Sequence, residues 1–261
     1  MWPFVHGAVA VSERVTARFR LRPLAGIAGL VVAAGCSHAS SSGSARAAAQ
    51  VRAAQARTIA RQAGLSADVQ AFLATAAGSS DVTYTVVYDQ GAGQTTTVIA
   101  RPPDRRIDVV GASGPGSTDR VIVKGSDTFV CHLDARRWAC VSGVASAPSG
   151  PFTPDAVTQT IGQLAQLSQT YDFSVTPRRM LDLDARCLAA TRRAGAPADP
   201  TVGDTGLICI SPRGVILRVE DNGTPVQATS YRERAPSGAF ALPARPTPVV
   251  TSTSVGSVGR P

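Results

Sequence analysis

Long apolar runs are absent from this sequence. The longest extends from Leu24 to Ala34 and has 11 residues, whereas a membrane-spanning helix needs about 20. Arginines precede this run, and Gly35 and Cys36 close it. A basic start, a short apolar middle and a small-residue end are the three parts of a secretory leader. The run therefore predicts a leader that is removed rather than a membrane span.

Histidine is scarce, and recognisable catalytic or metal-binding motifs are missing. His6 lies in the predicted leader and His38 just after it, which leaves His132. The sequence has neither a G-x-S-x-G elbow nor a C-x2-C pair, which are typical of hydrolases and zinc sites. We interpret His132 as a surface strand residue and expect no enzymatic activity, no metal ion and no cofactor. A Ser-His-Asp hydrolase is the alternative for His132.

Basic residues are numerous but dispersed. The formal net charge is +8, and Lys124 is the single lysine among 26 basic residues. A nucleic-acid surface needs basic residues gathered in a stripe or patch, so we expect no nucleic-acid partner. Residues Gly111–Gly116 lack the Lys-Ser/Thr end of a phosphate loop and predict an interstrand loop. Asp182 and Asp184 are predicted to share one side of a strand, as solvated carboxylates.

The predicted leader ends on a cysteine rather than on an Ala-x-Ala site. This ending resembles the signal of bacterial lipoproteins, in which the cysteine is lipidated and becomes the first mature residue. Ala33 stands where such signals usually carry Leu, Val or Ile. The resemblance implies a signal peptide over residues 1–35 and an anchor on Cys36 at the extracytoplasmic face of the cell membrane. Ordinary secretion, with Cys36 an incidental thiol, is the alternative.

Four further cysteines form an even set, which in an exported chain suggests two disulfides with three possible connectivities. A hairpin centred on Ala135–Arg136 would place Cys131 opposite Cys140, within disulfide reach. Cys187 and Cys209 then pair by elimination. Buried free thiols are the alternative, and an oxidising compartment disfavours them.

Composition divides the rest of the chain into three parts. Residues 36–46 are the predicted lipidated cysteine and a Ser-rich flexible tether, residues 47–243 a folded domain, and residues 244–261 a disordered tail rich in Pro, Thr and Ser. Within the domain, Ala47–Ala63 predicts a helix from its alanines and arginines. Ser66 predicts the N-cap of a second, shorter helix.

From Asp81 onward, the hydrophobic period changes to two, which is typical of half-buried strands. Turn signals separate these short segments and favour an antiparallel sheet over alternating βαβ units. The predicted strands are 82–88, 94–101, 106–110, 120–124, 128–133, 138–142, 171–175, 180–191, 206–211, 214–220 and 225–232.

One helix is predicted between the strands. Thr153 is a suitable N-cap and Pro154 a suitable first residue. Apolar residues then recur at helical spacing, at Val157, Ile161, Leu164 and Leu167. The stripe is interpreted either as ordinary packing of a helix on a sheet or as a lid over an apolar ligand cavity.

The order of these elements resembles the lipoprotein-carrier fold of LolA and LolB, which the lipid-binding lipoproteins of mycobacteria and the sensor domain of RseB-like regulators share. The segments that carry the resemblance are Val82–Tyr88, Pro102-Pro103, Phe129–Cys131, Trp138–Cys140, Pro154–Gln169, Cys187, Gly206–Cys209, Pro212–Gly214 and Phe240–Pro243.

The resemblance implies an α+β fold in which a curved antiparallel sheet forms an unclosed half-barrel. N-terminal helices and the inserted amphipathic helix would cover one face of that sheet. It also implies non-catalytic binding or carriage of a lipid or another hydrophobic ligand. The stripe of four apolar residues would then contact that ligand. A structural or sensory envelope lipoprotein that acts through a protein-partner surface is the alternative.

Overall fold

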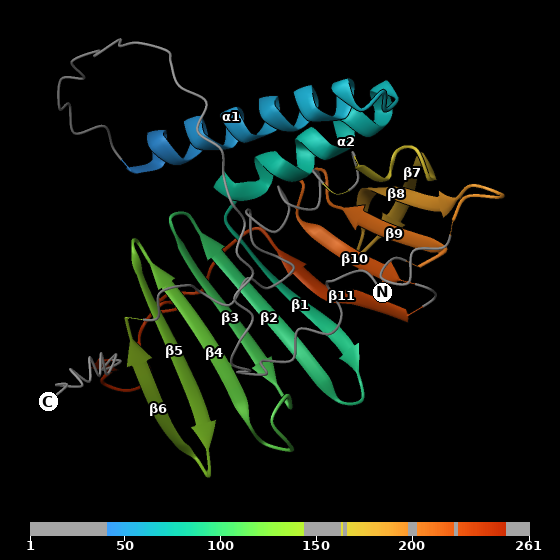
Figure 1. Cartoon of the computed structure of the whole chain (residues 1–261). Helices are drawn as coiled ribbons and strands as arrows, with labels where there is room; N and C mark the ends of the chain where they lie inside the picture. The colour runs from blue at the N-terminus through green and yellow to red at the C-terminus, as the bar shows by residue number, and fades with distance from the viewer. Residues whose placement is uncertain (1–40, 144–162, 164–165, 198–202, 222–223, 249–261) are drawn as a thin grey trace, which may run out of the picture.

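The computed structural model describes residues 41–143, 163, 166–197, 203–221 and 224–248 (Figure 1). These residues form an α+β fold with two α-helices, α1 (Ser41–Gln62) and α2 (Ala67–Gly78), and a short 3-10 turn at Ser79–Asp81. None of the helices in these ranges is both long and apolar enough to cross a membrane.

Twelve strands make one sheet in the order β12-β6-β5-β4-β3-β2-β1-β11-β10-β9-β8-β7. Neighbouring strands are antiparallel except β12, which runs parallel to β6. The two edges are different strands, so the sheet is not closed, and the predicted unclosed antiparallel sheet is confirmed. The strands are β1 (Tyr84–Gly91), β2 (Gln94–Arg101), β3 (Asp104–Val110), β4 (Thr118–Lys124), β5 (Asp127–Asp134), β6 (Arg137–Ser142), β7 (Tyr171–Met180), β8 (Leu183–Arg192), β9 (Thr205–Ile210), β10 (Ile216–Asp221), β11 (Thr224–Arg232) and β12 (Thr247–Pro248).

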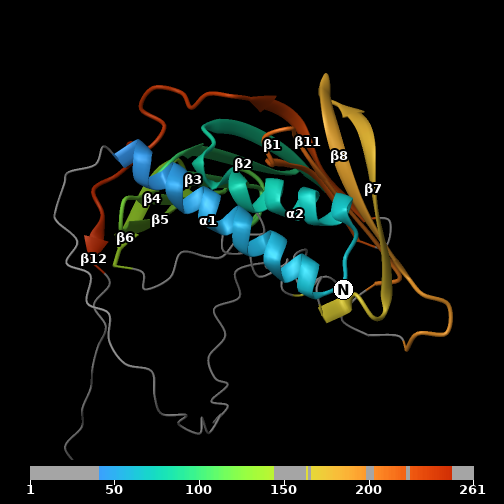
Figure 2. The same ribbon diagram turned by 90° about the horizontal axis from the view of Figure 1, so that it is seen from above.

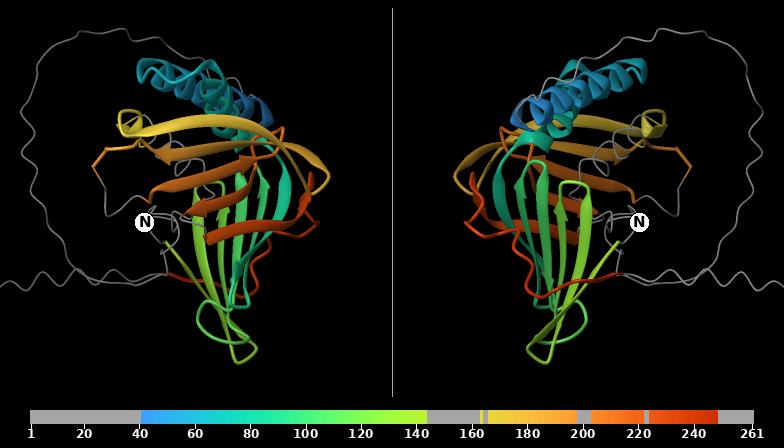
Figure 3. Two further views of the ribbon diagram at one scale, coloured as in Figure 1. Left: turned by 90° about the vertical axis from the view of Figure 1, so that its right-hand side faces the viewer. Right: turned by 90° about the vertical axis from the view of Figure 1, so that its left-hand side faces the viewer.

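The sheet is strongly curved. The register shifts between Val87 and Tyr88 where β1 meets β11, and again between Ile216 and Arg218 where β10 meets β9. An extra residue at such a bulge bends the strand and increases its twist. As a result, β2–β6 run nearly across the direction of β7–β11 (Figure 3). Both α-helices lie inside the arc of the sheet (Figure 2).

Helix α1 is built mostly from alanine and arginine, which are strong helix formers. It ends in a Schellman arrangement, because Gly64 has a φ of 71° and the Leu65 N–H donates to the Ala60 carbonyl. The helix begins at Ser41, so the prediction of a flexible tether is wrong for residues 41–46. The first turn of α1 includes Ser42, Gly43 and Ser44. It is tolerated because Ala45 and Arg46, which are strong helix formers, follow directly.

The helices pack on the second half of the sheet. Val69, Phe72 and Leu73 of α2 form one buried cluster with residues of β7, β8 and β9, among them Tyr171 and Leu188. Burying this apolar face contributes about 25 cal/mol per Å² removed from water. Packing on the sheet, rather than helix propensity alone, therefore holds α2 in place.

One predicted strand boundary is wrong. The segment 180–191 was expected to be a single strand, but Leu181 and Asp182 adopt left-handed φ values of 48° and 62°. They form the two-residue turn between β7, which extends to Met180, and β8. Two-residue hairpins need positive φ at both central positions, and no Gly or Asn marks this turn in the sequence.

Residues 244–248 belong to the described fold, so the prediction of a disordered tail is wrong for them. Thr247 and Pro248 pair with β6 at the edge of the sheet, where a proline without an N–H is tolerated. Upstream, Ala239 and Phe240 pack on Ile99 and Ile122. The rest of the predicted tail, 249–261, lies outside the described residues.

Candidate functional site: an aliphatic row on the concave face

Cross-strand register aligns aliphatic side chains across six neighbouring strands, from β1 to β6. We call these residues the aliphatic row. It consists of Val86, Val98, Ile107, Val121, Val130 and Val141. Directly paired residues on one face bring their Cβ atoms to about 5 Å, so the row forms a continuous apolar strip.

The strip lies on the face of the sheet that carries the helices. On β11, Ala228 pairs with Tyr88 of β1, and Val226 lies two residues away on the same face. Through β10, Val226 connects by register to Ile208 and Leu188. Those two residues pack in the cluster formed with α1 and α2. The aliphatic row therefore belongs to the concave face.

Burial decreases along the row. Val86 and Val98 are fully buried at 0 % exposure. The members on β3, β4 and β5 are half-buried, and Val141 on β6 is 38 % exposed. An apolar strip that becomes progressively more accessible to solvent can receive another apolar group.

On the opposite, convex face, the chain itself covers part of β2–β4. Ala239 and Phe240 pack there on Ile99 and Ile122. The Arg101 guanidinium lies 4.9 Å from the centroid of the Phe240 ring. Arg106 Nη1 donates to the Ala239 carbonyl at 3.0 Å. These contacts cover the convex face around Ile99 and Ile122, whereas the aliphatic row lies on the other face of the sheet.

Two buried tyrosines flank the row at β1. Tyr88 donates a hydrogen bond to the Ile216 carbonyl at 2.7 Å, and burial raises its pKa well above the usual value for tyrosine. Burial also raises the pKa of Tyr84, an effect that the nearby positive charge of Arg105 reduces. Arg105 pairs with Ala100 and Val123 next to the row, so a half-buried guanidinium borders the apolar strip.

The other flank carries a polar cluster. His132 Nδ1 lies 2.6 Å from Asp119 Oδ1, and the Ser113 hydroxyl donates to Asp119 Oδ2 at 3.1 Å. In a Ser-His-Asp triad, serine and aspartate bond to opposite nitrogens of the imidazole. Here the serine bonds to the carboxylate instead. The side chains of His132 and Asp119 are 44 % and 35 % exposed.

The structure describes only one of the four predicted lid residues. Val157, Ile161 and Leu164 lie outside the described residues. Leu167 is described, is half-buried, and packs against the cluster that α1 and α2 form with the sheet. It is not a member of the aliphatic row.

The prediction that Asp182 and Asp184 share one side of a strand is wrong, although both are solvated as predicted. Asp182 lies in the β7–β8 turn, whereas Asp184 is on β8 and forms an exposed ion pair with Arg179 at 2.8 Å. The glycine-rich segment Gly111–Gly116 connects β3 to β4, as predicted for an interstrand loop. Its backbone closes on itself, since the Gly111 N–H donates to the Ser117 carbonyl.

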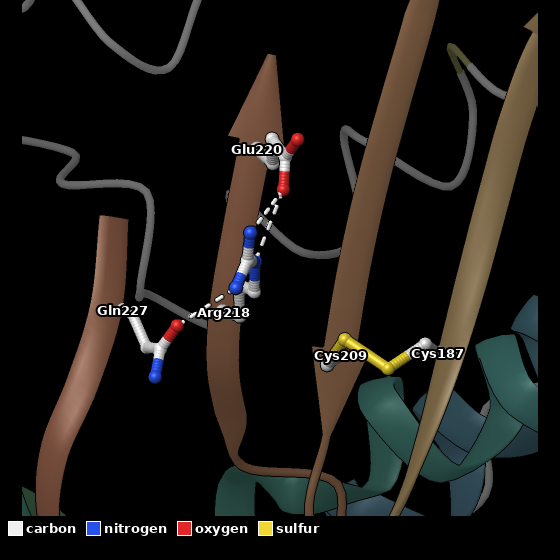
Figure 4. The surroundings of a disulfide bond; sticks show 5 residues. All are labelled: Cys187, Cys209, Arg218, Glu220 and Gln227. Atoms are coloured by element: carbon white, nitrogen blue, oxygen red, sulfur yellow. Dashed lines mark hydrogen bonds and ion pairs between the residues drawn. A yellow bond between two sulfur atoms is a disulfide. The ribbon is translucent and has the colours of Figure 1, made fainter. Parts of the chain in front are cut away.

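Both predicted disulfides are present. Cys131–Cys140 joins β5 to β6 and Cys187–Cys209 joins β8 to β9, each with a Cα–Cα distance of 4.0 Å between directly paired residues. Figure 4 shows the second bridge beside Arg218, which donates to Glu220 at 3.1 Å and to Gln227 at 2.8 Å. The bridges fix the strand register in both halves of the sheet.

Neither the comparisons with known proteins nor the arrangement of possible metal ligands assigns a function to this chain. Among the described residues, no group of three or more His, Cys, Asp or Glu side chains is arranged to hold a metal ion. No protein-family model matches this chain, and a search of the curated proteins also finds no match.

Proposed function

We propose that this chain is a lipoprotein anchored through Cys36 to the extracytoplasmic face of the cell membrane. It binds a lipid or another hydrophobic ligand on the aliphatic row and has no catalytic step. The observation that supports this proposal most directly is the half-exposed apolar strip on the concave face of β3–β6. A ligand there would remove apolar surface from water, at about 25 cal/mol per Å².

The shape of the strip favours an elongated ligand. The accessible part of the row, on β3–β6, crosses three interstrand spacings of about 4.8 Å each, or about 14 Å in all. A long, narrow apolar strip suits an extended acyl chain better than a compact ring system. Arg105 borders the strip, and its positive charge suits an acidic headgroup.

Export is supported by two independent features of the sequence. One is the short apolar leader that ends on Cys36. The other is the pair of disulfides, since such bridges form and persist in oxidising compartments. A thiol-rich cytosol would leave all four bridge cysteines reduced.

The test compares two matched glutamate substitutions. Val141 and Val110 are 38 % and 39 % exposed, but register places Val141 on the concave face and Val110 on the convex one. Lipids extracted from the purified protein are identified and counted by mass spectrometry. We expect Val141→Glu to lose the bound lipid and Val110→Glu to keep it.

Three results would separate the candidates. Equal lipid content in both variants would place the ligand elsewhere. A correctly folded wild-type protein that carries no lipid would contradict lipid binding. If that lipid-free protein then captured an envelope protein, and Val141→Glu prevented the capture, the structural or sensory function would replace the carrier function.

A further inference from the structure

Helix α1 carries positive charge only. Its 22 residues include four arginines and no Asp or Glu. Between Glu13 and Asp68, the sequence contains no acidic residue at all. The surface that this helix presents to solvent is therefore cationic at every physiological pH, because the arginine side chain does not lose its proton.

Three of the four arginines lie along one exposed flank of the helix. At 3.6 residues per turn, Arg46, Arg57 and Arg61 fall within an arc of about 60° and extend over about 22 Å of helix axis. All three are exposed. We call this surface the arginine flank.

One other face of α1 packs against the protein. Ala49, Ala56 and Ala60 are buried, and Arg52 points to the 3-10 turn, where its Nη2 donates to Ser80 Oγ at 3.0 Å. Within the described part of the chain, no acidic side chain pairs with the arginine flank. The charge of this flank is consequently available to an external partner.

The position of α1 allows such a partner to be a flat surface. The helix lies at one extremity of the molecule, and no other described helix or strand lies beyond it (Figures 1 and 3). Cys36 precedes Ser41, the first residue of the helix, by five positions. Five residues span at most about 18 Å, so an acyl anchor on Cys36 would hold the start of α1 close to the headgroups.

We propose that the arginine flank of α1 docks on the anionic headgroups of the membrane in which Cys36 is anchored. This docking rests on the proposed lipoprotein function, because the anchor supplies the proximity. Each basic residue at an anionic surface raises partitioning about fivefold. Three therefore raise it on the order of 100-fold, which is enough to orient a protein that is already tethered.

The experiment uses the exported, purified full chain with vesicles of phosphatidylcholine, with or without phosphatidylglycerol. Hydrogen exchange of the α1 amides reports docking, and vesicle flotation reports binding. The variant is Arg46→Gln/Arg57→Gln/Arg61→Gln. The control, Arg136→Gln/Arg137→Gln/Arg178→Gln, removes the same charge from exposed arginines on the sheet hairpins.

Docking predicts slower exchange across α1 on the anionic vesicles alone. The effect should disappear in the α1 variant, persist in the control, and disappear at about 1 M salt, where the Debye length is about 3 Å. Equal exchange on both kinds of vesicle, or an unchanged result in a folded α1 variant, would overturn the proposal.

The mass of the intact protein separates this proposal from the anchor. If Cys36 carries no lipid but flotation on anionic vesicles is still lost in the α1 variant, docking holds and the anchor fails. If Cys36 is acylated and α1 exchanges equally on both vesicles, the anchor holds and docking fails.

Discussion

Asp108 and Arg120 face each other across β3 and β4, with Arg120 Nε 2.7 Å from Asp108 Oδ1. The same carboxylate accepts from Arg106 Nε at 2.8 Å, and Arg120 also lies over the Trp138 ring at 4.5 Å. Asp108 is only 7 % exposed. One buried carboxylate thus serves as the counter-charge of two neighbouring guanidinium groups on the convex face.

Replacing Asp108 with asparagine should therefore be strongly destabilising. Both arginines would remain largely buried without a counter-charge, which costs about 3–5 kcal/mol. The matched control is Asp184→Asn, because Asp184 pairs with Arg179 at a site where its side chain is 87 % exposed. An exposed pair contributes about 0–1 kcal/mol. Urea unfolding measures both variants, and equal losses would refute the assigned role of Asp108.

The two disulfides should differ in their contribution to stability. Cys131–Cys140 and Cys187–Cys209 span 9 and 22 residues. Loop-closure entropy assigns about 2.6 and 3.4 kcal/mol to loops of these lengths. We therefore expect Cys187→Ala/Cys209→Ala to unfold at a lower urea concentration than Cys131→Ala/Cys140→Ala. A melting temperature that reductant leaves unchanged would show that neither bridge contributes.

The first bridge could be predicted because its information is local. A two-residue turn at Ala135–Arg136 fixes the register of its hairpin, and the register alone places Cys131 opposite Cys140. The β7–β8 turn is equally short. It was missed because no Gly, Asn or Pro interrupts 180–191, and no pair of cysteines flanks Leu181 and Asp182 closely enough to indicate a hairpin register.

The aliphatic row is a non-local feature, and this explains why the sequence did not predict it. Each member belongs to a different strand, and each strand separately resembles any half-buried strand with alternating apolar residues. Only the pairing of six strands reveals that Ile107, Val121 and Val130 adjoin one another. Similarly, residues 244–248 have the composition of a tail, but Thr247 and Pro248 pair with the distant strand β6.

Burial of Tyr88 predicts a loss of stability at alkaline pH. Its pKa is raised in the folded protein, so above about pH 10 the unfolded chain releases this proton first. The contribution of Tyr88 to the free energy of unfolding is therefore fully present below about pH 10. It decreases as the pH rises toward the folded-state pKa. One such group contributes a slope of about 1.4 kcal/mol per pH unit.

Tyr88→Phe isolates this effect. At pH 7 it should cost about 1 kcal/mol, the net value of the hydrogen bond to the Ile216 carbonyl. Between pH 10 and 11 its free energy of unfolding should decline less steeply than that of the wild type. Urea titrations across this range supply both values. Parallel pH profiles would mean that Tyr88 ionises in the folded state as readily as in the unfolded one.

The anchor itself is tested by Cys36→Ala. Stable attachment needs two acyl chains, since a single chain binds only marginally, and this substitution removes the acceptor of both. We expect the variant to leave the membrane fraction for the soluble one, whereas Ser37→Ala should remain. Release should be less complete at low ionic strength, because the arginine flank of α1 still attracts anionic lipid. It should become complete in salt, which screens that attraction. A wild-type protein that is soluble and unacylated at Cys36 would establish ordinary secretion instead.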